Sequence, residues 1–70
     1  MWTALKGMRE ARAYTRKEVG DAIGATEHTV WSLERGITKA PRPRTVRMLA
    51  EFYGVTPDEI RAACAQEVAA

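Results

Sequence analysis

The chain has 70 residues, of which 46% are hydrophobic and 29% charged, and a formal net charge of +2. This length allows one domain, and the composition is that of a globular protein and not of a disordered chain. The single cysteine, Cys64, excludes an internal disulfide and favours a reducing cytoplasm, and no apolar run approaches the ~18 residues of a membrane span.

The positive charge is concentrated in the first two-thirds of the chain. Residues 1–47 carry ten Lys/Arg against five acids, whereas residues 48–70 carry one arginine against four acids. This uneven distribution of charge predicts that one face of the protein is directed towards a polyanion and that another face is not. Ordinary solvated surfaces show the same pattern. The start at Met1, with no signal peptide behind it, is expected for a complete small protein of the cytoplasm.

Residues 3–13 are predicted to form a first helix, because Leu5 and Met8 recur at helical spacing. Gly7 costs this helix about 1 kcal/mol relative to alanine. Trp2 is expected to cover the end of a helix bundle in preference to binding a ligand.

Residues 15–36 are predicted to be two short helices separated by a tight turn. Thr15 and Glu18 have the spacing of a capping box at the start of the first helix. Gly24 suits the left-handed backbone that often ends a helix, and Thr26 can cap the second one. Two helices this short cannot bury their apolar faces alone, so they require the flanking segments as a scaffold.

A stiff loop follows over residues 37–43, because two prolines restrict its backbone. Lys39, Arg42 and Arg44 lie on or beside this loop, and cations on a rigid segment lose less entropy when they reach a phosphate. Pro43 suits the first position of the next helix.

Two further helices complete the prediction, over residues 44–53 and about 57–68. Met48 and Phe52 form an apolar line in addition to the core stripe of the first of these helices. The inward stripe of the last helix consists of Ile60, Cys64 and Val68. No strand is predicted, so the fold class is all-α with five helices.

The chain resembles the Cro/C1-type (XRE family) helix-turn-helix regulators of phages and bacteria. The resemblance covers about residues 4–62 and is most specific in Arg-x-x-Arg ahead of the two-helix unit, in LERG at its end, and in LAEFYGVTPDEI. It implies a single compact, lambda-repressor-like domain over residues 1–70, with the helix-turn-helix unit at 15–36. Residues 26–35 would then be the recognition helix, which enters the major groove of DNA.

The resemblance also assigns scaffold residues and shows departures. It implies an ion pair between Arg9 and Glu34 that ties the first helix to the third. Gly20 replaces the alanine that is usual in the second helix, which keeps a close helix approach but weakens the helix. The loop after Gly36 is longer and richer in proline than usual.

Four positions correspond to base-reading positions of the family: Glu27, His28, Trp31 and Ser32. Glu27 only accepts hydrogen bonds, so the cytosine N4 amino group is its natural target, and His28 suits guanine or adenine. Plainer roles stay open: Glu27 stabilises the positive end of its helix, His28 is solvated, and Trp31 packs over the loop or on another protein.

The phosphate-binding residues that the same reasoning predicts flank this helix. They are Arg16, Lys17, Thr26, Thr29, Arg35, Lys39, Arg42 and Arg44. The dimer surface is expected on the last two helices, at Met48, Phe52, Ile60, Cys64 and Val68.

The predicted function is sequence-specific binding of double-stranded DNA, as a repressor or Cro-like switch protein. A homodimer on a palindromic operator is expected, with half-sites about 10–10.5 bp apart. The alternatives are the DNA-binding antitoxin of a toxin–antitoxin pair and a protein-interaction module on the same fold. One histidine, one cysteine and scattered carboxylates predict no enzyme, no metal, no cofactor and no small-molecule ligand.

Overall fold

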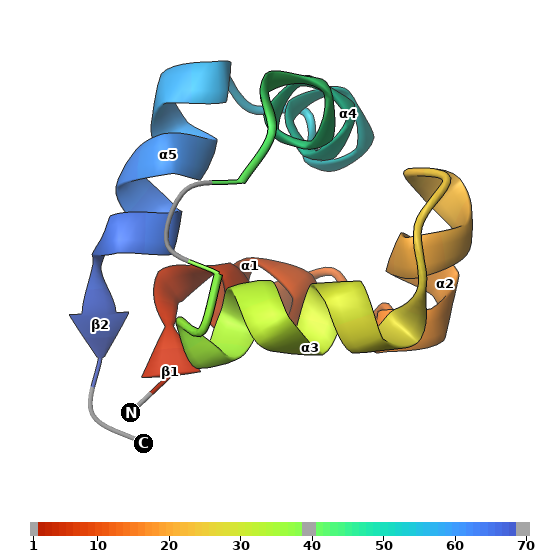
Figure 1. Ribbon diagram of the computed structural model, residues 1–70, viewed down its shortest axis with the longest axis horizontal. Helices are drawn as coiled ribbons and strands as arrows, with labels where there is room; N and C mark the ends of the chain where they lie inside the picture. Colours follow the sequence, from red (N-terminus) through yellow and green to blue (C-terminus); the bar gives the residue numbers. More distant parts are fainter. Residues whose placement is uncertain (1, 39–40, 69–70) are drawn as a thin grey trace.

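The computed structural model describes residues 2–38 and 41–68 (Figure 1). These residues form five helices and one pair of short strands. In order they are β1 (Trp2–Thr3), α1 (Ala4–Ala11), α2 (Arg16–Ala22), α3 (Glu27–Arg35), α4 (Pro43–Tyr53), α5 (Pro57–Ala65) and β2 (Glu67–Val68). In Figure 1, α3 runs between α2 at one end and the strands at the other, with α4 opposite it. The prediction of an all-α domain with five helices is confirmed.

The helix starts are set by local capping, as the sequence predicts. The Thr15 hydroxyl accepts a hydrogen bond from the Glu18 N–H at 3.1 Å, and the Glu18 carboxylate accepts one from the Thr15 N–H at 2.8 Å. Thr56 and Glu59 form the same reciprocal pair at the start of α5. Each pair satisfies N–H groups that have no partner within the helix, so the starts of α2 and α5 are fixed locally.

Two predicted helix ends are wrong. The first helix was expected over residues 3–13 but ends at Ala11, and Ala13 has a left-handed backbone with φ 58°. The last helix was expected to reach residue 68 but ends at Ala65, because Gln66 is extended with ψ 110°.

The residues after α5 form a strand that the sequence did not predict. β2 pairs antiparallel with β1, Trp2 opposite Val68 and Thr3 opposite Glu67. The Ala4 N–H donates to the Gln66 carbonyl at 3.0 Å, which continues the pairing into α1. Apolar spacing alone cannot reveal a partner that lies more than 60 positions away.

The core takes apolar side chains from all five helices. Its buried residues are Leu5, Val19, Ile23, Val30, Leu33, Val46, Leu49, Ala50, Tyr53, Ile60, Ala63 and Cys64. Met48 and Phe52 are half-buried against this cluster, and the Phe52 ring lies 4.7 Å from that of Tyr14. The second apolar line of α4 therefore already has partners within the domain. Within the described residues, no helix has the length and apolar character needed to cross a membrane.

A buried charge cluster ties α1 to α3. The Glu34 side chain is 1% exposed and accepts from Arg9 Nε at 2.7 Å and from Arg9 Nη2 at 3.2 Å. Arg9 Nη1 also donates to the Tyr14 carbonyl at 2.8 Å. The hydrogen bond with Glu34 raises the pKa of the Arg9 guanidinium. The predicted Arg9–Glu34 ion pair is confirmed, and it holds α3 to α1.

Raising the pH from 10 to 12 is expected to destabilise the fold through Tyr53. Burial, together with the negative charge of Glu34, raises the pKa of this phenol to about 12. The unfolded chain releases the proton near pH 10, before the folded chain does, so the free energy of unfolding falls with pH across this window. The expected loss that this residue contributes is at most about 2–3 kcal/mol.

Urea unfolding followed by circular dichroism at pH 8, 10 and 11 measures this effect. Tyr53→Phe removes the titrating group and keeps the ring, so its stability should fall less over the same window. Equal losses in the parent and Tyr53→Phe would contradict the assignment to Tyr53.

Candidate nucleic-acid interface

The turn between α2 and α3 fixes where α3 begins and the direction in which it runs from the end of α2. The Ala25 N–H donates to the Gly20 carbonyl at 2.8 Å, and Gly24 has the left-handed φ of 68° that the sequence predicts. The Thr26 hydroxyl accepts from the Thr29 N–H at 3.1 Å and caps α3. The N-terminal turn of α3 is thus held by hydrogen bonds at the surface of the domain.

The outward face of α3 carries the predicted base-reading residues. Glu27 and His28 are exposed, and Trp31 and Ser32 are half-buried, whereas Val30 and Leu33 lie in the core. The His28 ring stacks on the Trp31 ring with centroids 5.5 Å apart. Three of the four predicted residues, Glu27, His28 and Trp31, line one hollow of about 320 Å³ together with Arg16. The structure therefore brings hydrogen-bonding groups and an aromatic ring together at the start of α3.

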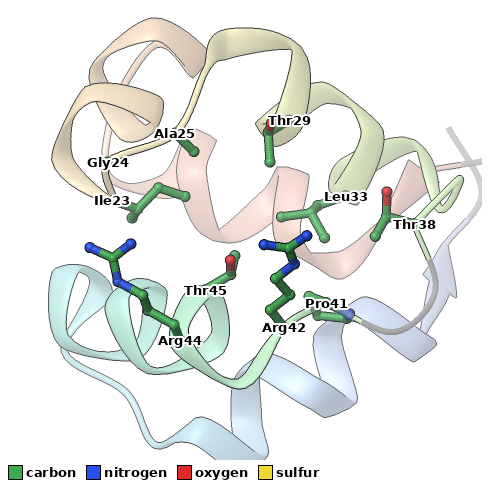
Figure 2. Close-up of a pocket in the computed structure, with 10 residues that line it drawn as sticks. All are labelled: Ile23, Gly24, Ala25, Thr29, Leu33, Thr38, Pro41, Arg42, Arg44 and Thr45. Carbon is green, nitrogen blue, oxygen red and sulfur yellow. The ribbon is translucent and has the colours of Figure 1, made fainter.

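A larger hollow of about 440 Å³ lies on another side of α3. Figure 2 shows the guanidinium groups of Arg42 and Arg44 reaching into it from the start of α4, with Thr45 between them. Thr29 of α3 faces the same hollow. Two guanidinium groups and two hydroxyl groups are donors that suit a phosphate oxygen. The structure brings together Arg42, Arg44 and Thr29 of the predicted phosphate-binding set.

The other predicted phosphate contacts are more dispersed. Lys17 is exposed on α2 and pairs with Asp21 at 3.1 Å. Arg35 is exposed at the last position of α3, and Thr26 is occupied as its cap. Lys39 lies outside the described residues.

Arg16 has a structural partner that the sequence did not reveal. Its Nε donates to Glu34 Oε1 at 3.1 Å, and its side chain remains 30% exposed. Arg16 thus contributes to the buried charge cluster and retains an accessible part beside His28 and Trp31.

Sequence reasoning also missed Thr38 and Thr45, which line the larger hollow. Threonine at these positions carries no signal in one sequence, since only the folded chain brings both residues to the hollow that Thr29 also lines.

The predicted dimer surface needs correction. Ile60 and Cys64 are 0% and 6% exposed, so their side chains are part of the core and are not available to a second copy. Val68 lies in β2 and not on a helix stripe. Burial also raises the pKa of the Cys64 thiol, which disfavours the reactive thiolate. Of the predicted surface, Met48 and Phe52 keep partly exposed side chains.

In the part of the chain that the structure describes, no three His, Cys, Asp or Glu residues are grouped in a way that would hold a metal ion.

Comparison with known proteins identifies the family. The helix-turn-helix domain profile matches residues 3–63. The chain is 36% identical over 56 residues to the cryptic phage CTXphi transcriptional repressor RstR of Vibrio cholerae, a match that covers 80% of this chain. The matched region spans only 50% of that relative. No solved structure gives a significant match. The resemblance to Cro/C1-type regulators is thus confirmed, and the chain belongs to the helix-turn-helix domain family.

Proposed function

We propose that this protein is a sequence-specific binder of double-stranded DNA that represses transcription, with α3 placed in the major groove. The observation that carries the proposal is the arrangement around α3. Its exposed N-terminal turn presents Glu27 and His28, and the hollow that holds Arg42 and Arg44 lies beside the same helix. Helix-turn-helix proteins insert the second helix of the unit with its N-terminal residues towards the bases. The relative from Vibrio cholerae is named a transcriptional repressor, which supports the same output here.

Within this proposal the side chains have separate tasks. Glu27 accepts a hydrogen bond from cytosine N4, and His28 contacts the edge of a neighbouring purine. Arg42 and Arg44 neutralise backbone phosphates and fix the register of α3, but they carry no sequence information themselves. Repression then follows by occlusion of the promoter.

A homodimer on a palindromic operator completes the proposal. Helix-turn-helix dimers place two recognition helices about one helical turn apart, at 10–10.5 bp. A core drawn from 70 residues gives limited stability, so association with a second copy is a natural supplement. The exposed parts of Met48 and Phe52 on α4 are the surface we assign to this contact.

The salt dependence of DNA binding tests the phosphate contacts. Arg42→Gln and Arg44→Gln should each move the slope of log affinity against log salt towards zero by about 0.9, the value for one phosphate contact. Arg61→Gln is the matched control, because it removes one charge on α5 that is already paired with Asp58 at 3.1 Å. Fluorescence anisotropy with a labelled duplex of random sequence measures the slope without knowledge of the operator.

Two results would count against the proposal. Parent-like slopes in both arginine variants would remove the larger hollow from the interface. Failure of the parent to bind DNA even at low salt would instead favour the protein-interaction module on the same fold.

A further inference from the structure

Trp2 lies at the centre of a group of cations that come from three different helices. Lys6 Nζ of α1 lies 4.5 Å from the centroid of the Trp2 ring. The guanidinium carbon of Arg35, at the end of α3, lies 5.0 Å from it, and that of Arg16, at the start of α2, 5.3 Å. Cation–π contacts form within about 6 Å of a ring centroid, so all three groups interact with one indole.

The backbone around Trp2 is held firmly against α3. The Thr3 side chain is fully buried, and its hydroxyl lies 3.2 Å from the Leu33 carbonyl and 3.0 Å from the Glu34 carbonyl. Pairing with β2 fixes the other edge of β1. The indole therefore occupies a defined position beside the C-terminal end of the recognition helix.

Among the side chains that the structure describes, the charges around the ring are not balanced. No two of the three cationic groups can be farther apart than about 10 Å, roughly one Debye length at 0.1 M salt, so they repel one another. The carboxylate of Glu34 binds Arg16 but also binds Arg9, so two guanidinium groups share one negative charge. An indole face attracts cations without neutralising them. This arrangement of cations favours the binding of an anion.

The position of these three cations relative to α3 indicates which kind of anion would bind them. Arg16 lines the hollow that contains Trp31, whereas Thr29 lines the hollow of Arg42 and Arg44. At 3.6 residues per turn, Trp31 and Thr29 point to roughly opposite sides of α3. A helix in the major groove has a phosphate backbone on each side. The two groups of cations are thus placed to meet the two backbones.

We propose that Lys6, Arg16 and Arg35, gathered around Trp2, form a second site for a DNA backbone phosphate, across α3 from Arg42 and Arg44. Trp2 is the positioning residue, and Lys6 is an additional phosphate contact. The inference rests on the proposed DNA-binding function and deepens it, since it assigns a group of cations to the phosphate backbone on each side of the major groove.

The test uses fluorescence anisotropy of the full chain with a labelled random-sequence duplex of about 20 bp, from about 50 to 300 mM salt. Lys6→Gln should weaken binding about 3- to 8-fold at 0.1 M salt and move the salt slope towards zero by about 0.9. Lys6→Arg should keep the parent slope, because it keeps the charge. Arg61→Gln, the control on α5, should keep both affinity and slope.

Trp2→Leu tests the positioning role, because it removes the aromatic face but keeps an apolar strand residue. We expect about a 3-fold or larger loss of affinity, which Trp2→Phe should largely restore because it keeps a π-face. Circular dichroism and urea unfolding establish whether the variants are folded. If Trp2→Leu is not folded, the comparison of Lys6→Gln with Lys6→Arg decides the question.

The outcomes separate this inference from the function on which it rests. A slope change in Lys6→Gln that neither Lys6→Arg nor the control Arg61→Gln shows supports the second phosphate site. Parent-like affinity and slope in Lys6→Gln would overturn it, while the parent still binds DNA and the proposed function stands. A parent that binds no DNA at about 50 mM salt would overturn both.

Discussion

Arg9→Met is expected to lower the free energy of unfolding by about 3–5 kcal/mol, because it leaves the carboxylate of Glu34 buried without its main partner. Glu34 is 1% exposed, and Arg9 supplies two of its hydrogen bonds, at 2.7 and 3.2 Å. Arg16 supplies only one more, at 3.1 Å, from a partly exposed side chain. A chain of 70 residues has a total stability of roughly 4–10 kcal/mol, so this loss is a large fraction of the total.

Urea unfolding followed by circular dichroism measures this loss, and a second variant identifies its cause. Arg9→Met combined with Glu34→Leu replaces the ion pair by apolar groups of similar length, so no fully buried charge remains, because the side chain of Arg16 is 30% exposed. We expect the double variant to recover much of the stability that Arg9→Met loses. A double variant that is no more stable than Arg9→Met would show that the loss comes from packing and not from an unpaired carboxylate.

Gly20→Ala is expected to destabilise the domain by about 1–3 kcal/mol, although alanine is the better helix former by about 1 kcal/mol. A Cβ at Gly20 would lie 2.8 Å from the Thr26 carbonyl carbon, 2.9 Å from its oxygen and 3.0 Å from the Glu27 nitrogen. All three are backbone atoms, so no side-chain rotation relieves the contact. α2 and the start of α3 would have to separate, which would also displace the N-terminal turn of α3 and should weaken the proposed DNA binding.

Gly7→Ala is the matched control for Gly20→Ala. Both glycines lie within helices, but a Cβ at Gly7 meets no atom within 4 Å. Gly7→Ala should therefore stabilise the domain by about 0.5–1 kcal/mol through helix propensity alone. Thermal unfolding of the two variants beside the parent gives the comparison. Equal stabilisation by both substitutions would contradict the close approach of α2 and α3.

The features that the sequence predicted correctly depend on neighbours in the chain. Thr15 with Glu18, and Thr26 ahead of α3, mark helix starts because capping needs residues only three positions apart. The Arg9–Glu34 ion pair spans 25 positions and came from the family resemblance instead. The strand pairing between Trp2 and Val68 has neither kind of signal, since two-residue strands carry no detectable alternation.

The candidate site was predictable to a similar extent. Glu27 and His28 are exposed at the start of α3 as the capped helix requires, and Arg42 and Arg44 share one hollow. The double role of Arg16 and the cations around Trp2 were not predictable, because they depend on β1 lying against the end of α3. Likewise, the spacing of Ile60 and Cys64 does not distinguish a core stripe from a dimer stripe, and only their burial in the fold does.

The measurement that tests the central proposal most directly is a binding selection on random duplex DNA at about 150 mM salt, with the purified parent chain. We predict enrichment of a palindrome with half-sites 10–10.5 bp apart. Glu27→Ala and His28→Ala should then each change preference at a single position of the half-site by about 1–3 kcal/mol. Recovery of no motif, with binding that depends only on salt, would contradict sequence-specific recognition by α3.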